Sequence, residues 1–223
     1  MCAGYLGEDA PSGALCSDCQ QTLPRTEQAQ LRQNGTEMQL AGQTRDIVAA
    51  LRVMHLERAA AFVFFEKEHP IRQLVHRMKY ADQPMIGYRL GRLAAMEMQY
   101  ADFFDEIDII VPVPLHRNRL RERGYNQSEY IARGISEVTG IPMDTTHVAR
   151  IKDTPKQALQ SGDNRKTNVA DAFAVNHPEQ MYHKHILLVD DLITTGETIR
   201  ACLRGMRLFR GARFSVFALC KAR

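Results

Sequence analysis

One stretch near the carboxyl end of the sequence, residues 186–198, restricts the fold more than any other feature. It opens with Ile-Leu-Leu-Val, a run typical of a central strand buried on both faces of a parallel sheet. Two carboxylates, Asp190 and Asp191, follow the run, and a Thr-Thr-Gly turn then leads into a predicted helix. Because parallel sheets bind ligands at the carboxyl ends of their strands, the stretch predicts a binding site there.

The residue types in this stretch indicate what the site holds. A turn at a helix start offers backbone amides, hydroxyl donors and the positive end of the helix dipole, which together suit an anion. The candidate substrate-binding residues of the turn and helix start are Thr194, Thr195, Gly196, Glu197 and Thr198. Ionised Asp190 and Asp191 suit the hydroxyl groups of a sugar instead. An isolated Asp-Asp pair is more often a turn or helix cap, but the complete pattern favours a site for a phosphorylated ribose.

This stretch resembles the phosphoribosyl pyrophosphate signature of the type I phosphoribosyltransferases. More narrowly, the sequence is similar to the ComF family, phosphoribosyltransferase-like proteins linked to bacterial competence and DNA uptake. Further matching segments lie at residues 74–80, 111–116, 121–127 and 154–157 with 168–169, in the family's order. The resemblance covers residues 56–223. It implies an α/β type I phosphoribosyltransferase fold, with a mainly parallel central sheet flanked by helices and a small amino-terminal zinc-ribbon-like remnant.

Hydrophobic periodicity divides the chain into two parts. Residues 1–45 are polar, with weak periodicity, and are expected to form the cysteine-containing ribbon remnant and a connector. Residues 46–223 are expected to form the phosphoribosyltransferase-like domain. Strands are predicted at residues 62–65, 107–111, 147–151, 173–175, 186–189 and 214–219, and helical patterns lie between several of them. This alternation predicts an α/β domain with a largely parallel sheet.

Composition limits the function classes. The 223 residues suit one main core with a small appendage, and no apolar run is long enough to cross a bilayer. The formal net charge of +3 is too small to argue by itself for a nucleic-acid partner. The protein is therefore expected to be cytoplasmic, without membrane insertion. A homodimer is left open.

Cysteines near the amino terminus indicate a candidate metal site. Cys16 and Cys19 form a Cys-x-x-Cys knuckle, and Cys2 lies upstream as a third thiolate. ComF relatives build a zinc ribbon from paired knuckles, which implies that this set lacks a fourth ligand. Bound Zn²⁺ and a lost or truncated site are both left open.

The segment after the predicted strand at residues 107–111 is a candidate diphosphate loop. Its residues Pro114, His116 and Arg117 are the candidate ligands, by resemblance to the pyrophosphate loop of the family. The alternative is that the prolines only end the strand. Mg²⁺ is expected to arrive with phosphoribosyl pyrophosphate, held largely by the oxygens of the substrate and by water.

Arginines alternate just beyond this loop, at Arg117, Arg119, Arg121 and Arg123. Three interpretations remain open: a solvated basic face, a clamp for diphosphate, and a track for a nucleic-acid backbone.

A long polar segment, residues 152–168, lacks a periodic face. By resemblance it is the hood that closes over the site and excludes water, and Lys156 and Arg165 would add positive charge to the leaving diphosphate. An ordinary surface loop is the alternative.

These features predict a phosphoribosyltransferase that uses Asp190, Asp191, Lys156 and Arg165 as its candidate catalytic residues. Its acceptor is an unidentified nitrogen nucleophile, and the resemblance implies a role in DNA uptake and competence. The alternatives are a non-catalytic competence accessory protein that binds single-stranded DNA or DNA-uptake proteins, and a sensor of phosphoribosyl pyrophosphate. Lys79 and Tyr80 are expected to be structural residues at a helix end, and His185 is expected to be exposed before a strand.

Overall fold

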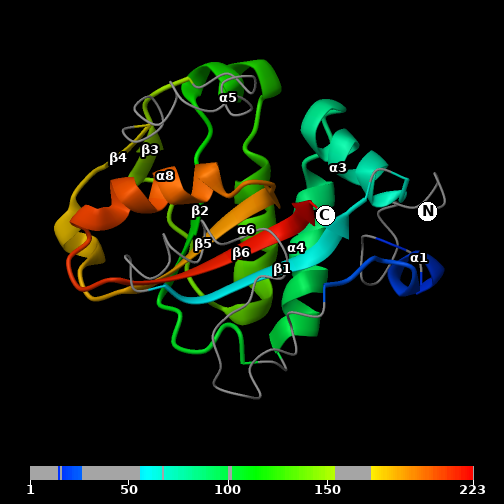
Figure 1. The fold of residues 1–223 in the computed structure, drawn as a ribbon, viewed down its shortest axis with the longest axis horizontal. Helices are drawn as coiled ribbons and strands as arrows, with labels where there is room; N and C mark the ends of the chain where they lie inside the picture. Colours follow the sequence, from blue (N-terminus) through cyan, green and yellow to red (C-terminus); the bar gives the residue numbers. More distant parts are fainter. Residues whose placement is uncertain are drawn as a thin grey trace.

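The main sheet of the protein has four parallel strands in the order β1, β6, β5, β2 (Figure 1). The computed structural model describes residues 15, 17–26, 56–66, 68–99, 102–153 and 172–222. The strands are β1 (Leu56–Phe65), β2 (Ile109–Pro112), β5 (His185–Ile193) and β6 (Arg213–Ala222). β5 and β6 are mostly buried because they are the two central strands, covered on both faces.

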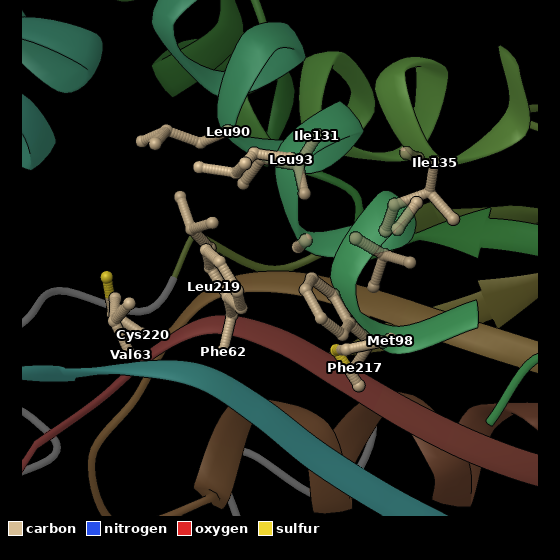
Figure 2. Close-up of a cluster of buried hydrophobic side chains, with 14 of the residues drawn as sticks. Phe62, Val63, Leu90, Leu93, Met98, Ile131, Ile135, Phe217, Leu219 and Cys220 are labelled. Atoms are coloured by element: carbon tan, nitrogen blue, oxygen red, sulfur yellow. The ribbon is translucent and has the colours of Figure 1, made fainter. Parts of the chain in front are cut away.

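Helices cover both faces of this sheet, as Figure 1 shows. On one face lie α3 (Ile71–Tyr80), α4 (Met85–Met98) and α6 (Gln127–Thr139), and on the other lies α8 (Glu197–Gly205). Figure 2 shows the first of these cores, in which side chains of α4 and α6 meet Phe62, Phe217 and Leu219 of the sheet. The second core joins α8 to β5 and β6, and Cys202 is buried within it. Two short helices, α1 (Ser17–Gln21) and α5 (Arg117–Arg123), complete the set of described α-helices.

Helices α4 and α6 cross at two glycines. A Cβ atom added to Gly91 would collide with the backbone of Ile131, and one added to Gly134 would collide with the backbone of Tyr88. The backbones can come this close only because neither glycine has a side chain. The crossing fixes α6, whose amino end approaches β5, against the rest of its layer.

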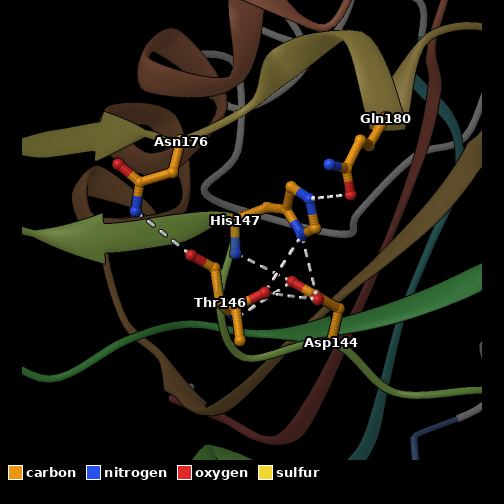
Figure 3. A network of polar contacts seen from close by, with 5 residues as sticks. All are labelled: Asp144, Thr146, His147, Asn176 and Gln180. Carbon is orange, nitrogen blue, oxygen red and sulfur yellow. Dashed lines mark hydrogen bonds and ion pairs between the residues drawn. The ribbon is translucent and has the colours of Figure 1, made fainter.

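A second sheet contains only the antiparallel strands β3 (Val148–Arg150) and β4 (Phe173–Val175). A polar network beside it involves Asp144, Thr146, His147, Asn176 and Gln180, as Figure 3 shows. Burial alone would raise the pKa of Asp144, but hydrogen bonds from His147 and Thr146 outweigh it and lower that pKa. The network therefore joins the segment before β3 to the 3₁₀ helix η4 (Pro178–Met181) that follows β4.

The predicted fold class is confirmed as α/β with a mainly parallel central sheet flanked by helices. β1 begins at Leu56, six residues before the predicted strand. Three further details differ from the expectations. β5 extends through Asp190 and Asp191 to Ile193, whereas a strand ending at residue 189 was predicted. β3 and β4 form their own sheet instead of extending the main one.

His185 is the third difference, because it is fully buried at the start of β5 instead of exposed. Its Nε2 lies 2.9 Å from Oγ of Ser215 on β6, a partner that sequence periodicity does not reveal. Among the described residues, no helix is both long enough and apolar enough to span a membrane.

Candidate functional site

Asp190 and Asp191 lie where β5 continues past its neighbour β2. β2 pairs with residues 186–189 of β5 and ends at Pro112. Asp190 pairs only with Ala218 of β6, so one edge of β5 no longer has a strand beside it. Loss of the neighbouring strand at this point lets polar groups from helices approach the carboxylates.

The two carboxylates leave β5 on opposite faces, because successive residues of a strand alternate. Asp191 shares its face with Leu187 and Val189, which belong to the core beneath α3, α4 and α6. Asp190 shares the other face with Leu188, which packs in the core beneath α8. The two carboxylates therefore point toward different layers of the domain.

Asp191 forms an ion pair with Lys79, the penultimate residue of α3. Nζ of Lys79 lies 2.9 Å from both Oδ1 and Oδ2 of Asp191. Lys79 was expected to be a structural residue at a helix end, so this contact adds it to the candidate site. Residues 74–80 resemble a family segment, but that pattern does not indicate the partner of Lys79, since 112 residues separate the two side chains.

Asp190 is buried and accepts two hydrogen bonds. Oγ of Ser128 donates to its Oδ1 over 3.2 Å, and the backbone N–H of Asp191 donates to the same oxygen over 2.8 Å. Burial and the charge of Asp191 raise the pKa of Asp190 to about 7, against the opposing effects of these hydrogen bonds and of Lys79. Near neutral pH, Asp190 therefore holds a proton part of the time, whereas an exposed aspartate would not.

Ser128 reaches Asp190 because of how α6 begins. Asn126 caps the helix by accepting the N–H of Ser128 at 3.2 Å, as expected for an asparagine N-cap. The Nδ2 atom of Asn126 donates to the carbonyl of Val113, which follows β2, over 3.1 Å. One side chain thus ties the start of α6 to the candidate diphosphate loop.

The turn after β5 contains the candidate anion-binding residues and leads directly into α8. Thr194 and Thr195 are exposed, and Gly196 caps α8 with φ +78°, a conformation that favours glycine. The start of α8 has no side-chain cap. Glu197, however, forms an ion pair with Arg200 one turn along, which occupies its carboxylate. The turn therefore offers backbone amides and threonine hydroxyls to a ligand.

The candidate diphosphate loop lies beside β5. The backbone N–H of Val113 donates to the carbonyl of Val189 over 2.8 Å, which places the loop next to the acidic pair. His116 is buried and caps α5 by accepting the N–H of Asn118 on Nδ1 at 3.3 Å. Pro114 is half-buried, and Arg117 is exposed at the first position of α5.

The four arginines of α5 divide into two groups. Arg117 and Arg121 are exposed. Nε of Arg119 lies 3.5 Å from a carboxylate oxygen of Asp153, and the guanidinium of Arg123 stacks 5.2 Å from the ring centre of Tyr80. The exposed pair remains available to a ligand, whereas Arg123 also contributes to the packing between α5 and α3.

Arg150, at the end of β3, was not among the predicted site residues. Its guanidinium packs 5.5 Å from the ring centre of Phe173, and burial together with the charge of Arg119 lowers its pKa. Its positive charge also interacts with the carboxylates of Asp153 and Asp190. Nothing in the local sequence distinguishes it from the arginines of an ordinary strand end.

Several predicted residues lie outside the described part of the chain. They are Lys156 and Arg165 of the candidate hood, and Cys2 and Cys16 of the candidate zinc site. Cys19 is described and packs in the hydrophobic core with Leu15 and Leu23. Among the described residues there is no group of three or more His, Cys, Asp or Glu side chains that could hold a metal ion.

Comparisons with known proteins place the chain in a family. It is 31% identical over 155 residues to the DNA utilization protein YhgH of Escherichia coli, a match covering 68% of this chain and 67% of that protein. It is 32% identical over 158 residues to Competence protein F of Haemophilus influenzae, covering 69% of each. A shorter match, 27% over 103 residues, joins it to Competence protein ComFC of Bacillus subtilis, of which it covers 38%. These relatives show that the chain belongs to the ComF family. A comparison with models of protein families found no match.

Solved structures that resemble the protein do so weakly. A glutamine phosphoribosylpyrophosphate amidotransferase from B. subtilis matches with a TM-score of 0.42 and 19% identity, over 64% of this chain and 30% of that one. A hypoxanthine-guanine phosphoribosyltransferase from Leishmania donovani matches with a TM-score of 0.34 and 13% identity, over 61% and 67%. Scores this low carry no argument about the site.

Proposed function

We propose that the protein binds phosphoribosyl pyrophosphate with Mg²⁺ and transfers its ribosyl phosphate to a nitrogen acceptor. The observation that carries this proposal is the position of Asp190 and Asp191 on β5, three residues before a turn that opens helix α8. This order supplies hydroxyl acceptors and an anion site within one short segment. Family membership and the predominantly parallel sheet support the same assignment.

Each part of the site has a role in this reaction. The acidic pair accepts the ribose hydroxyls, and the amides and hydroxyls of residues 194–196 bind the 5-phosphate. The loop after β2, with Arg117, binds the diphosphate, and Mg²⁺ enters bound to diphosphate oxygens and water. The bond from ribose carbon to diphosphate oxygen breaks with its electron pair on the diphosphate. The acceptor nitrogen forms the new bond and releases a proton.

The predicted hood completes the proposal. Lys156 and Arg165 would stabilise the negative charge of the leaving diphosphate while the closed hood excludes water from the cationic sugar. An alanine substitution at either position should then lower the rate of diphosphate release more than it weakens ligand binding. Equal losses in rate and affinity would assign these residues to binding alone.

Calorimetry with phosphoribosyl pyrophosphate and Mg²⁺ tests the proposal. We expect binding by the native protein and none by the double variant Asp190→Asn, Asp191→Asn. The matched control is Asp102→Asn with Asp105→Asn, which removes two exposed carboxylates before β2, at the opposite end of the sheet. Unaltered binding by the Asp190, Asp191 variant would refute the assignment. A screen of nucleobases and amines for diphosphate release would identify the acceptor.

A second proposed function is binding of single-stranded DNA along α5. The exposed Arg117 and Arg121 favour it, since phosphate contacts dominate such binding. The names of the relatives, a DNA utilization protein and competence proteins, point in the same direction.

Fluorescence anisotropy with a labelled oligonucleotide over a range of salt concentrations tests this second function. We expect Arg117→Gln with Arg121→Gln to weaken binding and to lower the slope of log affinity against log salt by about 1 to 2. The charge-matched control is Arg204→Gln with Arg207→Gln, which removes one exposed arginine from the last turn of α8 and one from η5 (Met206–Leu208). Equal slopes for both double variants would rule out a track along α5.

A further inference from the structure

The ion pair between Lys79 and Asp191 lies inside the candidate site and joins α3 to β5. Its Nζ to oxygen distances are both 2.9 Å, and the two side chains are only 15% and 14% exposed. Both oxygens of Asp191 therefore face one cation in a place largely removed from water. A charge pair in such a place interacts more strongly than one at an exposed surface.

Packing, and not only charge, holds Lys79 in position. α3 buries Ile71, Leu74, Val75 and Met78 against the domain. The hydroxyl of Tyr125 donates to the carbonyl of Met78 over 2.7 Å, so the residue just before Lys79 is fixed to the segment that precedes α6. The ammonium group thus starts from a helix end that is already anchored.

Two adjacent carboxylates create an electrostatic problem for a ligand that is itself an anion. If both were ionised and uncompensated, they would repel a ribose phosphate. If they shared a proton, one of the two hydroxyl acceptors would be lost in part. In the structure, Lys79 is the counterion of Asp191.

Other groups around the pair do not replace this counterion. The thiol of Cys220 on β6 faces Asp191, and burial raises the pKa of that thiol to about 12. On the other side of β5, Arg150 and the thiol of Cys202 interact with Asp190. Burial first, and then the charge of Asp191, raises the pKa of Asp190, and Lys79 opposes this rise.

We infer that Lys79 is the positioning residue of the acidic pair, whose ammonium group offsets the charge of Asp191 so that the pair accepts the hydroxyls of an anionic ribose phosphate. Lys79 acts through Asp191 and is not itself a catalytic residue. The inference rests on the proposed function for the identity of the ligand. The effect of Lys79 on the two carboxylates does not require the ligand.

Three substitutions test the role of Lys79 in binding. Lys79→Met removes the charge, Lys79→Arg keeps it, and Arg72→Met removes one exposed charge from the same helix as a control. We expect Lys79→Met to weaken binding of phosphoribosyl pyrophosphate about tenfold at pH 7, the loss of one largely buried charge interaction. Its pH profile should shift upward, because the pair then holds its proton to higher pH. Lys79→Arg should restore most of the affinity, and Arg72→Met should bind normally.

A second measurement separates this inference from the proposed function. Carboxyl carbon resonances of the unliganded protein, followed by NMR from pH 4 to 9, should titrate at higher pH in Lys79→Met than in the native protein. Lys79→Gln, which keeps a donor without the charge, serves if the methionine variant does not fold. Absence of any binding by the native protein would refute the proposed function and leave this titration as the test of Lys79. An unshifted titration, or tighter binding by Lys79→Met, would overturn the inference.

Discussion

Ser128 on α6 donates a hydrogen bond from Oγ to Oδ1 of Asp190 on β5 over 3.2 Å. The bond joins the amino end of a helix to the strand that carries the acidic pair. Both residues are buried, so the position of α6 bears directly on the charge state of Asp190.

Substitution of Ser128 by alanine should lower the free energy of unfolding by about 1 to 2 kcal/mol, because a buried acceptor loses a donor. The loss should be larger at pH 8 than at pH 5, since a donor stabilises the ionised carboxylate more than the protonated one. Urea denaturation at the two pH values measures both quantities. Equal losses would show that the bond does not depend on the charge of Asp190.

Asp190 should make the protein less stable as pH rises. Its folded-state pKa is about 7 and its ordinary value is 3.8, so between these values the native state holds a proton that the unfolded chain has released. The free energy of unfolding should fall across this window, by at most roughly 4 kcal/mol in total. Urea denaturation of the native protein and of Asp190→Asn from pH 4.5 to 8 isolates this contribution. Parallel curves for the two proteins would contradict the shift.

His185 should make the protein less stable as pH falls. Burial first, and then the charges of Arg213 and Arg58, lower its pKa, so the folded protein keeps the imidazole neutral. As pH falls below about 6.5, the unfolded chain binds a proton that the folded state refuses, and stability decreases. His185→Asn should unfold with a weaker pH dependence between 6.5 and 5. An NMR titration showing an ordinary imidazole pKa in the folded protein would exclude this explanation.

The crossing of α4 and α6 should not tolerate a methyl group. In Gly134→Ala, the added Cβ would meet the backbone of Tyr88 and Arg92, so the helices must separate. We expect the free energy of unfolding to fall by about 1 to 3 kcal/mol. Gly140→Asn is the control, because its site has open space and a positive φ that asparagine accepts. Similar stability of the two variants would mean that the crossing relaxes at little cost.

Local sequence patterns predicted the elements whose structure depends on residues close together in the sequence. The apolar run of β5 and the turn at Gly196 are examples, because their periodicity and turn chemistry lie within a few residues. The end of β5 was placed too early, since Asp190 and Asp191 look like loop residues although β6 continues to pair with β5 as far as Ile193.

The partners of the acidic pair were not predictable in this way. Lys79 and Ser128 reach β5 from helices that are distant in sequence, and only the packing of those helices brings them there. His185 was misjudged for the same reason, because its partner Ser215 lies on a neighbouring strand. The polar contacts of this site are tertiary, and a single sequence contains no local record of them.

The alternation of Asp190 and Asp191 across β5 has a mechanical consequence. A molecule held by both carboxylates would be coupled through Lys79 to α3, and through the electrostatic interaction of Asp190 with Cys202 to α8 on the other face of the sheet. Its binding would therefore restrain helices on both faces of the sheet at once. Ligand binding should therefore slow amide hydrogen exchange in α3 and in α8 together, although neither helix supplies the carboxylates.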